Sequence, residues 1–246
     1  MQDRGPIGRV PCLVPVKWID GWPMLGDEGK DLITYPKPAT GKKSKIKSPA
    51  TTDEFNASQL GLQWQWNHNP DNSLWSVSER KGYLRLKTGR IDTDFLSARN
   101  TLTQRTIGPV CSGTTSMDVS DMKEGDFAGL ALLQKKYGWI GVKYENGVKK
   151  IVMVSAQTDR PEEVESLPLN QNTVFLKAEC DFTDKKDIAD FYYSLDGKKW
   201  TKIGSQLKMA YTLPHFMGYR FGLFNYATKT PGGYVDFDYF RISDSK

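Results

Sequence analysis

Two tight-turn signals inside strand-like runs constrain the fold of this chain more than any other feature. Asn146-Gly147 lies in the middle of WIGVKYENGVKKIVMVSA, and Asp196-Gly197 lies in IADFYYSLDGKKWTKIG. Asn-Gly and Asp-Gly pairs accept the positive φ angles that a two-residue hairpin turn requires. Each of these segments therefore predicts two antiparallel strands.

The rest of the chain from about Thr51 onward has the same character. The segment TVFLKAECDF alternates between apolar and polar residues, as a half-buried strand does. Its apolar face would hold Val174, Leu176, Ala178, Cys180 and Phe182. Long helical periodicity does not occur, and RPEEVESL, residues 160–167, predicts one or two helical turns at most. Many short strands with almost no helix indicate an all-β sandwich or barrel.

The N-terminal part is separate from this β domain. Gly8–Lys30 reads as a strand pair, but an isolated hairpin is marginally stable in water, so it must pack on something. A Lys- and Pro-rich stretch follows it. The sequence therefore predicts terminal strands over residues 1–35, a linker over 36–49 and a β domain over 50–246.

The net charge of +5 comes from the linker. Its five lysines are Lys37, Lys42, Lys43, Lys45 and Lys47. Without them the chain has 29 basic and 29 acidic residues, so the folded part is nearly neutral. A basic run among Pro, Gly and Ser is typical of a solvated linker, and we expect no nucleic-acid partner.

Targeting and metal signals are weak. No apolar run approaches the length of a membrane span, and MQDRGPIG lacks the apolar core of a signal peptide. The three cysteines, Cys12, Cys111 and Cys180, are widely spaced and are expected to be reduced and buried. These features favour a cytoplasmic protein without a membrane partner. The two histidines, His68 and His215, lie too far apart in sequence to suggest a His-based zinc site.

Four segments in order resemble a known domain. They are LGLQWQWNHNPDNSLWSV, TDFLSARNTLTQRTIGP, YTLPHFMGYRFGLFNYAT and GGYVDFDYFRI. Together they resemble the concanavalin A-like β-sandwich, a jelly roll, that ends many glycoside hydrolase family 43 β-xylosidases and α-L-arabinofuranosidases. IGRVPCLVPVKWIDGWPMLG resembles the last strands of the five-bladed propeller that precedes this sandwich. The hairpin would then be a remnant of that propeller.

The resemblance implies the C-terminal accessory part of a glycosidase that acts on xylan-derived oligosaccharides. Such enzymes invert configuration with two carboxylates and a third acidic residue, all from propeller blades that are not in this sequence. No catalytic residue is therefore assigned, and the catalytic propeller is an expected partner. Two alternatives remain open: an independent carbohydrate-binding module for xylan or arabinoxylan, and an inactive structural fragment.

Three residues are implied by the resemblance to bind substrate. Arg9 matches a propeller arginine that reaches the non-reducing sugar, and its fixed N–H fork suits vicinal hydroxyls. Phe216 lies in the region that resembles a loop at the mouth of the propeller pocket, with His215 beside it as a hydrogen-bond donor. The alternatives are a surface arginine and a core phenylalanine.

Other side chains carry weaker signals. Glu179 and Asp181 share one strand face, but Thr183 follows, so we interpret the pair as a solvated polar face. Sugar-binding aromatics are also available, although most should be core and one exposed. They are Trp64, Trp66, Trp75, Tyr137 and Trp139.

A structural calcium ion is a further expectation from the resemblance. VDFDYFRI reproduces the final-strand pattern with Asp238, and Asp236 lies two residues earlier on the same face. Asp53, or Glu54 beside it, lies near the start of the domain and would be a partner ligand, since calcium prefers oxygen ligands. The alternative is a surface pair bonded to Arg241 or a turn. The exposed hairpin would also allow self-association.

Overall fold

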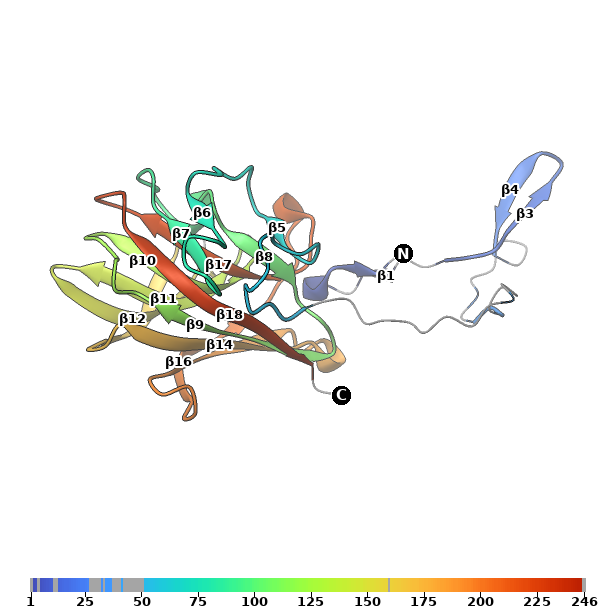
Figure 1. Ribbon diagram of the computed structural model, residues 1–246. Coiled ribbons are helices and arrows are strands. Elements are labelled where there is room, and N and C mark those ends of the chain that lie inside the picture. The colour runs from blue at the N-terminus through green and yellow to red at the C-terminus, as the bar shows by residue number, and fades with distance from the viewer. Residues whose placement is uncertain are drawn as a thin grey trace.

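The computed structural model contains two β-sheets packed face to face (Figure 1). The structure describes residues 2–3, 5–10, 13–26, 32, 34–36, 41, 51–158 and 160–244. The sandwich occupies the part from Thr51 to Asp244 and confirms the predicted all-β class. The linker lysines and Cys12 lie outside the described residues.

The first sheet has the strand order β13-β12-β11-β10-β17-β8-β5. Its strands are β5 (Gln65–Trp66), β8 (Leu102–Arg105), β10 (Asp126–Leu133), β11 (Gly138–Glu145), β12 (Val148–Ser155), β13 (Glu162–Pro168) and β17 (Arg220–Ala227). All neighbours pair antiparallel. Because β5 has only two residues and pairs with Leu102 and Thr103, the remaining residues of β8, Gln104 and Arg105, lie at the edge of the sheet.

The second sheet has the order β16-β15-β14-β9-β18-β7-β6. Its strands are β6 (Trp75–Ser76), β7 (Leu84–Lys87), β9 (Val110–Asp118), β14 (Thr173–Asp181), β15 (Ile188–Ser194), β16 (Thr201–Lys208) and β18 (Tyr234–Asp244). The long strand β18 lies inside this sheet and pairs with both β9 and β7. It carries Asp236 and Asp238, two of the three aspartates proposed as metal ligands.

Both predicted hairpins are present, but only Asn146-Gly147 forms the predicted two-residue turn, because Asp196-Gly197 lies in a longer connection over residues 195–200. Asn146 and Gly147 connect β11 to β12 with φ angles of 54° and 74°. Gly197, with a φ of 71°, lies between β15 and β16, where Asp196 Oδ1 accepts the backbone N–H groups of Lys198 and Lys199. Small polar side chains and glycine thus reverse the chain where the sequence indicated.

The helical turns predicted for residues 160–167 are wrong, because this segment forms the edge strand β13. Pairing with β12 gives its backbone groups hydrogen-bond partners, and Glu163 forms an ion pair with Lys143. Helices in the described residues are short 3-10 turns. They are η1 (Gly5–Ile7), η2 (Phe95–Ser97), η3 (Thr183–Lys185) and η4 (Leu213–His215). No helix among the described residues is long and apolar enough to cross a membrane.

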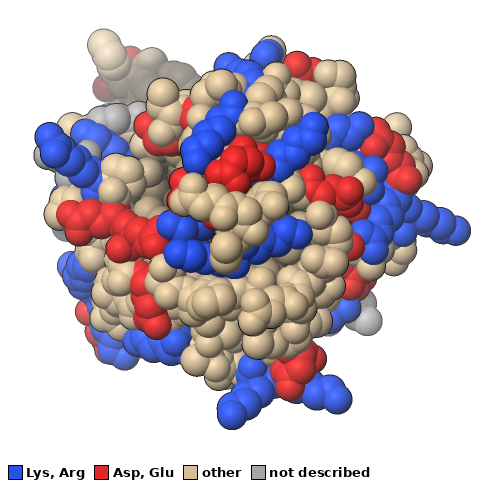
Figure 2. All heavy atoms as spheres, turned by 90° about the vertical axis from the view of Figure 1, so that its left-hand side faces the viewer, with Lys and Arg blue, Asp and Glu red and all other residues tan. Residues whose placement is uncertain are grey.

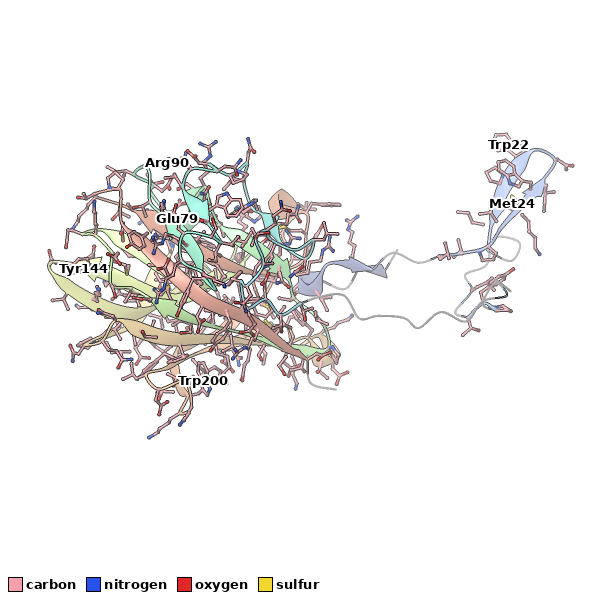
Figure 3. All side chains as sticks on the ribbon, in the orientation of Figure 1. Trp22, Met24, Glu79, Arg90, Tyr144 and Trp200 are labelled. Atoms are coloured by element: carbon pink, nitrogen blue, oxygen red, sulfur yellow. The ribbon has the colours of Figure 1, made fainter. Side chains whose placement is uncertain are left out.

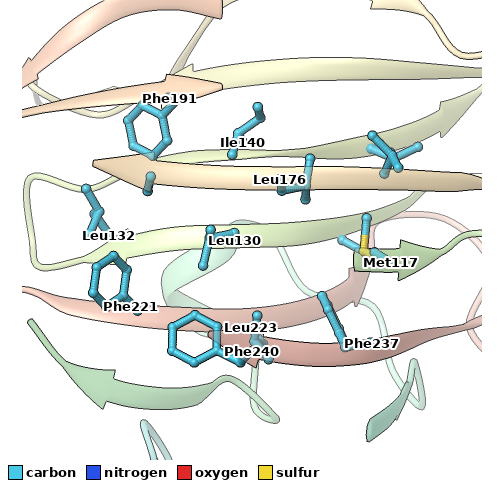
Figure 4. Packing of buried hydrophobic residues seen from close by; sticks show 14 of the residues in the cluster. Met117, Leu130, Leu132, Ile140, Leu176, Phe191, Phe221, Leu223, Phe237 and Phe240 are labelled. Atoms are coloured by element: carbon cyan, nitrogen blue, oxygen red, sulfur yellow. The ribbon is translucent and has the colours of Figure 1, made fainter. Parts of the chain in front are cut away.

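The main core lies between the two sheets (Figure 4). The predicted inward face of β14 is buried from Val174 to Cys180 at alternate residues. Gly129 on β10 is required by close packing, since a Cβ there would lie 2.2 Å from the carbonyl oxygen of Ile140. A second apolar cluster covers the outer face of the first sheet. Cys111 and Cys180 are buried and free, as expected.

The N-terminal region has two differently placed parts. The short strands β1 (Gln2–Asp3) and β2 (Arg9–Val10) flank η1 and lie close to the sandwich (Figure 1). The hairpin of β3 (Val16–Ile19) and β4 (Trp22–Leu25) stands away from it. Trp22 and Met24 project from this hairpin (Figure 3). Trp18 and Trp22 are 72% and 73% exposed, so the predicted hairpin is present but does not dock on the sandwich.

Candidate functional site

The segment of η1 packs against the loop that leads into β17. The backbone N–H of Tyr219 donates to the carbonyl oxygen of Pro6 at 2.8 Å. A Cβ at Gly218 would lie 2.3 Å from the carbonyl oxygen of Ile7, so this approach requires glycine. The contact fixes where Arg9, the next side chain along, meets the sandwich.

Arg9 and Phe216, which come from opposite ends of the sequence, meet in the structure. The Arg9 guanidinium carbon lies 4.0 Å from the centroid of the Phe216 ring. This distance allows a cation–π interaction. Phe216 remains 58% exposed and is held from another side by Tyr211, with ring centroids 6.1 Å apart. The alternative of a core phenylalanine is therefore wrong.

A cavity of about 460 Å³ opens beside this pair. It is lined by Ile7, Gly8, Arg9, Gln65, Arg105, Thr106, Tyr211, Phe216, Met217, Gly218, Tyr219 and Arg220. None of these described residues is acidic, so the cavity alone does not hold a pair of carboxylates for acid and base catalysis.

Two buried polar atoms near Phe216 lack a hydrogen-bond partner among the described residues. They are the hydroxyl oxygen of Tyr211 and Nδ1 of His215. Burial lowers the pKa of His215, and His68 and Lys135 lower it further, so its imidazole is neutral at pH 7. Leaving such groups unpaired is unfavourable, which makes them fit to bond an approaching polar group.

A larger hollow of about 890 Å³ continues from this cavity around the end of β8. The two share Gln65, Arg105, Thr106 and Arg220. Arg105 on β8 stands opposite Arg220 on β17 in the sheet register. No local pattern in the sequence singles out these two arginines, because only the pairing of two distant strands brings them together.

The carboxylates on β14 have local basic partners. Lys177 Nζ donates to Glu179 Oε1 at 2.7 Å. Hydrogen bonds from Lys186 and Thr183 lower the pKa of Asp181 to about 2, so it stays ionised and is unsuited to act as a general acid. This geometry agrees with the interpretation as a solvated polar face.

The three carboxylates proposed as calcium ligands have different surroundings. Asp236 accepts a bidentate pair from Arg85, with both N–O distances 2.8 Å, and a third bond from Arg80 at 3.0 Å. Asp53 accepts N–H groups from Phe55 and Trp64, each at 2.8 Å. The described residues contain no group of three or more candidate metal-ligating side chains.

Asp236 does not fit a calcium ligand, because the two guanidinium groups already neutralise it. Burial and the nearby Glu54 raise the pKa of Asp238. Arg241 forms its ion pair with Glu54, at 2.7 Å, and not with Asp238 as the alternative had it. The calcium ion stays a prediction, and a site would have to draw on Asp53, Asp238 and backbone carbonyls.

The five candidate sugar-binding aromatics belong mainly to the two apolar clusters. Tyr137 and Trp139 are buried in the outer cluster, and Trp64, Trp66 and Trp75 are partly buried against the main core. The expectation that one of them is exposed is wrong. Trp64 still lines the larger hollow at one edge. On the face seen in Figure 2, basic and acidic side chains are interspersed.

Comparison with protein families identifies a match over most of the chain. Residues 52–243 match the model of the β-xylosidase C-terminal concanavalin A-like domain. This range coincides with the sandwich and includes Phe216, Arg105 and Arg220. Arg9 lies outside it.

Known proteins match over nearly the whole chain. A β-xylosidase from Formosa agariphila is 34% identical over 95% of this chain and 42% of its own length. The solved structure of a bifunctional GH43-CE from Bacteroides eggerthii is 59% identical with a TM-score of 0.89, covering 100% of this chain and 32% of that one. An engineered GH43 glycoside hydrolase with endo-xylanase and exo-arabinofuranosidase activity is 33% identical with a TM-score of 0.85, covering 98% and 50%. This chain thus spans half or less of each relative.

Proposed function

The chain belongs to the family of β-xylosidase C-terminal concanavalin A-like domains, and we propose that it is the accessory sandwich of a glycosidase acting on xylan-derived oligosaccharides. In this proposal it shapes the substrate pocket of a catalytic propeller and is not catalytic by itself. The hairpin of β3 and β4 is the closing part of that propeller. Its exposed Trp18 and Trp22 would then be covered by the preceding blades.

The contact between Arg9 and Phe216 carries this proposal. It joins the segment next to the proposed propeller strands to an exposed aromatic of the sandwich. An exposed phenyl ring suits the apolar face of a sugar, and a guanidinium offers N–H donors for adjacent hydroxyls. Tyr211 and His215 would supply further polar contacts, since each has a buried atom without a partner among the described residues.

A hybrid enzyme tests this role. Residues 1–246 would replace the matching part of the Formosa agariphila β-xylosidase, and hydrolysis of nitrophenyl xyloside would be measured. We expect the hybrid to be active and Phe216→Ala to raise its KM about tenfold, equivalent to about 1.4 kcal/mol of binding. The 246-residue chain alone should hydrolyse neither nitrophenyl xyloside nor nitrophenyl arabinofuranoside.

The matched control is Trp200→Ala, because Trp200 lies between β15 and β16 and does not line the cavity (Figure 3). It should leave KM unchanged. Equal effects of the two substitutions would contradict the role of Phe216. Turnover by the chain alone that survives repurification and disappears in Glu179→Gln would refute the non-catalytic role. Tight binding of neutral xylo-oligosaccharides to the chain alone would favour the carbohydrate-binding module instead.

A further inference from the structure

Arg105 and Arg220 form a like-charged pair at the end of the first sheet. They are partners in the antiparallel register of β8 and β17, so their side chains leave the same face of the sheet. The Cβ atoms of such partners are about 5 Å apart, and like charges at this separation destabilise a sheet. A protein that retains this arrangement needs something to offset the repulsion.

The rest of the described protein supplies no carboxylate partner for either guanidinium. Arg220 Nη1 donates to Thr103 Oγ1 at 3.1 Å, and among the described residues neither arginine forms an ion pair. Arg220 is only 9% exposed. Burial lowers the pKa of Arg220, and Arg105 lowers it further. A buried cation without an anion is unfavourable, so this position favours a negatively charged ligand.

The surroundings of the two arginines narrow the class of ligand. The hollow of about 890 Å³ falls in the range of small-molecule sites. Three glutamines line it together with apolar side chains of Leu62, Trp64 and Ile242. The glutamines are Gln63, Gln65 and Gln104. Amides beside an apolar edge suit a sugar, which has both hydroxyls and an apolar face. Asp244 also lines the hollow but forms no ion pair with either arginine.

We propose that this hollow binds the carboxylate of an acidic sugar, a uronic acid, between Arg105 and Arg220. Guanidinium groups hold carboxylates through paired N–H···O bonds that are stronger than neutral hydrogen bonds. The glutamine amides bond the ring hydroxyls of the same sugar. Because the hollow continues into the cavity of Arg9 and Phe216, one oligosaccharide reaches both. An acidic substituent on the sugar chain is thereby selected.

The link to an oligosaccharide rests on the proposed function, whereas carboxylate binding does not. Titration of the 246-residue chain with sodium glucuronate therefore tests the hollow without a catalytic domain. Isothermal calorimetry should show saturable binding in the millimolar range. Arg220→Gln and Arg105→Gln should each weaken it about tenfold or more, which is the value of one charge-assisted contact.

Controls separate the carboxylate from general charge effects. Arg160→Gln removes an exposed positive charge outside the hollow and should leave glucuronate binding unchanged. Neutral xylose and acetate should each bind at least about tenfold more weakly than glucuronate. Because Arg105 is exposed, Arg105→Gln should fold even if Arg220→Gln does not. Thermal melting shows whether each of the two variants is folded.

Three results would overturn the proposal. These are no saturable glucuronate binding, glucuronate binding that is unchanged in Arg105→Gln, and acetate binding as strong as glucuronate binding. Failure of Phe216→Ala to affect the hybrid enzyme would instead count against the proposed function alone.

Discussion

The sandwich contains two arginine pairs with opposite surroundings. Arg80 and Arg85 converge on Asp236, whose side chain is only 4% exposed. Arg105 and Arg220 face each other with no carboxylate between them in the described part of the chain. The hydrogen bonds of Asp236 raise the pKa of Arg85, whereas burial lowers that of Arg220.

The presence or absence of a carboxylate partner distinguishes arginines that stabilise the fold from arginines that can bind a ligand. A guanidinium whose donors are satisfied by a buried carboxylate locks strands together and has little capacity for a ligand. A guanidinium that is buried without such a partner is less favourable for folding and is available to an external anion. The cluster of Arg80, Arg85 and Asp236 therefore stabilises the sheet, whereas Arg105 and Arg220 are available to bind an anionic ligand.

Breaking the satisfied cluster should have the largest effect on stability. Asp236→Asn keeps the side-chain volume but leaves Arg85 and Arg80 without their shared charge. Removing one member of a buried ion pair is strongly destabilising, and we expect the free energy of unfolding to fall by about 3 kcal/mol. Urea denaturation followed by tryptophan fluorescence measures this loss.

An exposed ion pair of the same chemistry provides the control. Glu54 bonds Arg241 at 2.7 Å, with the two side chains 42% and 53% exposed. Glu54→Gln should lower the free energy of unfolding by less than about 1 kcal/mol. Similar losses for Glu54→Gln and Asp236→Asn would show that burial does not distinguish these clusters.

Asp126 is a buried carboxylate that has no guanidinium partner among the described residues, and it should make the stability of the sandwich depend on pH. Asp126 accepts the backbone N–H of Lys123 at 2.7 Å and the hydroxyl of Thr88 at 3.4 Å. Burial raises the pKa of Asp126 from 3.8 to about 6. The folded state therefore binds its proton more tightly than the unfolded state. The stabilisation by this protonated group is complete below the unfolded value and is lost as pH rises through about 6.

Substitution of Asp126 isolates this contribution. Asp126→Asn should gain stability relative to the wild type as pH rises from 3.8 to about 6. Denaturation of both proteins at a series of pH values gives the difference between their unfolding free energies. A difference that is constant across this window would mean that Asp126 is not protonated in the folded state.

Removing an unsatisfied arginine should have a smaller effect than removing its satisfied counterpart. We expect Arg220→Gln to change the free energy of unfolding by less than about 1 kcal/mol, because lost packing is offset by relief of an unpaired buried charge. The same urea denaturation measures it without ligand. A loss as large as that of Asp236→Asn would make Arg220 a structural residue and remove the contrast between the two pairs.

The parts of the fold that were predictable from the sequence are those that are encoded by short local patterns. The alternation in β14 and the Asn146-Gly147 turn are encoded within a few residues, so strands and hairpins follow from sequence. The edge strand β13 was mistaken for helical turns because its side chains are nearly all exposed and show no alternation. Its conformation depends on pairing with β12, which the segment itself does not reveal.

The candidate site was predictable only where a resemblance pointed to it. Arg9 and Phe216 were identified in this way, and their contact then emerged from the packing of η1. The pairing of Arg105 with Arg220 depends on the register of two strands far apart in sequence. For the same reason, the bonds of Arg85 to Asp236 were invisible when Asp236 was proposed as a metal ligand.

The hairpin of β3 and β4 extends the comparison from charge to apolar surface, and it should give the smallest effect. Trp18 and Trp22 are as unmatched as the arginines, being 72% and 73% exposed on a hairpin that stands away from the sandwich (Figure 1). The double substitution Trp18→Ser with Trp22→Ser should change the unfolding free energy of the sandwich by less than about 0.5 kcal/mol. Trp139→Ser, at a side chain 2% exposed, is the control and should destabilise it by about 3 kcal/mol or more. Sedimentation of the wild type and the double variant then tests whether the exposed indoles join two copies. A wild-type dimer that the double substitution converts to a monomer would show self-association through the hairpin. If the wild type and the double variant have the same mass, the exposed indoles do not join two copies, and their expected contact is with the catalytic propeller.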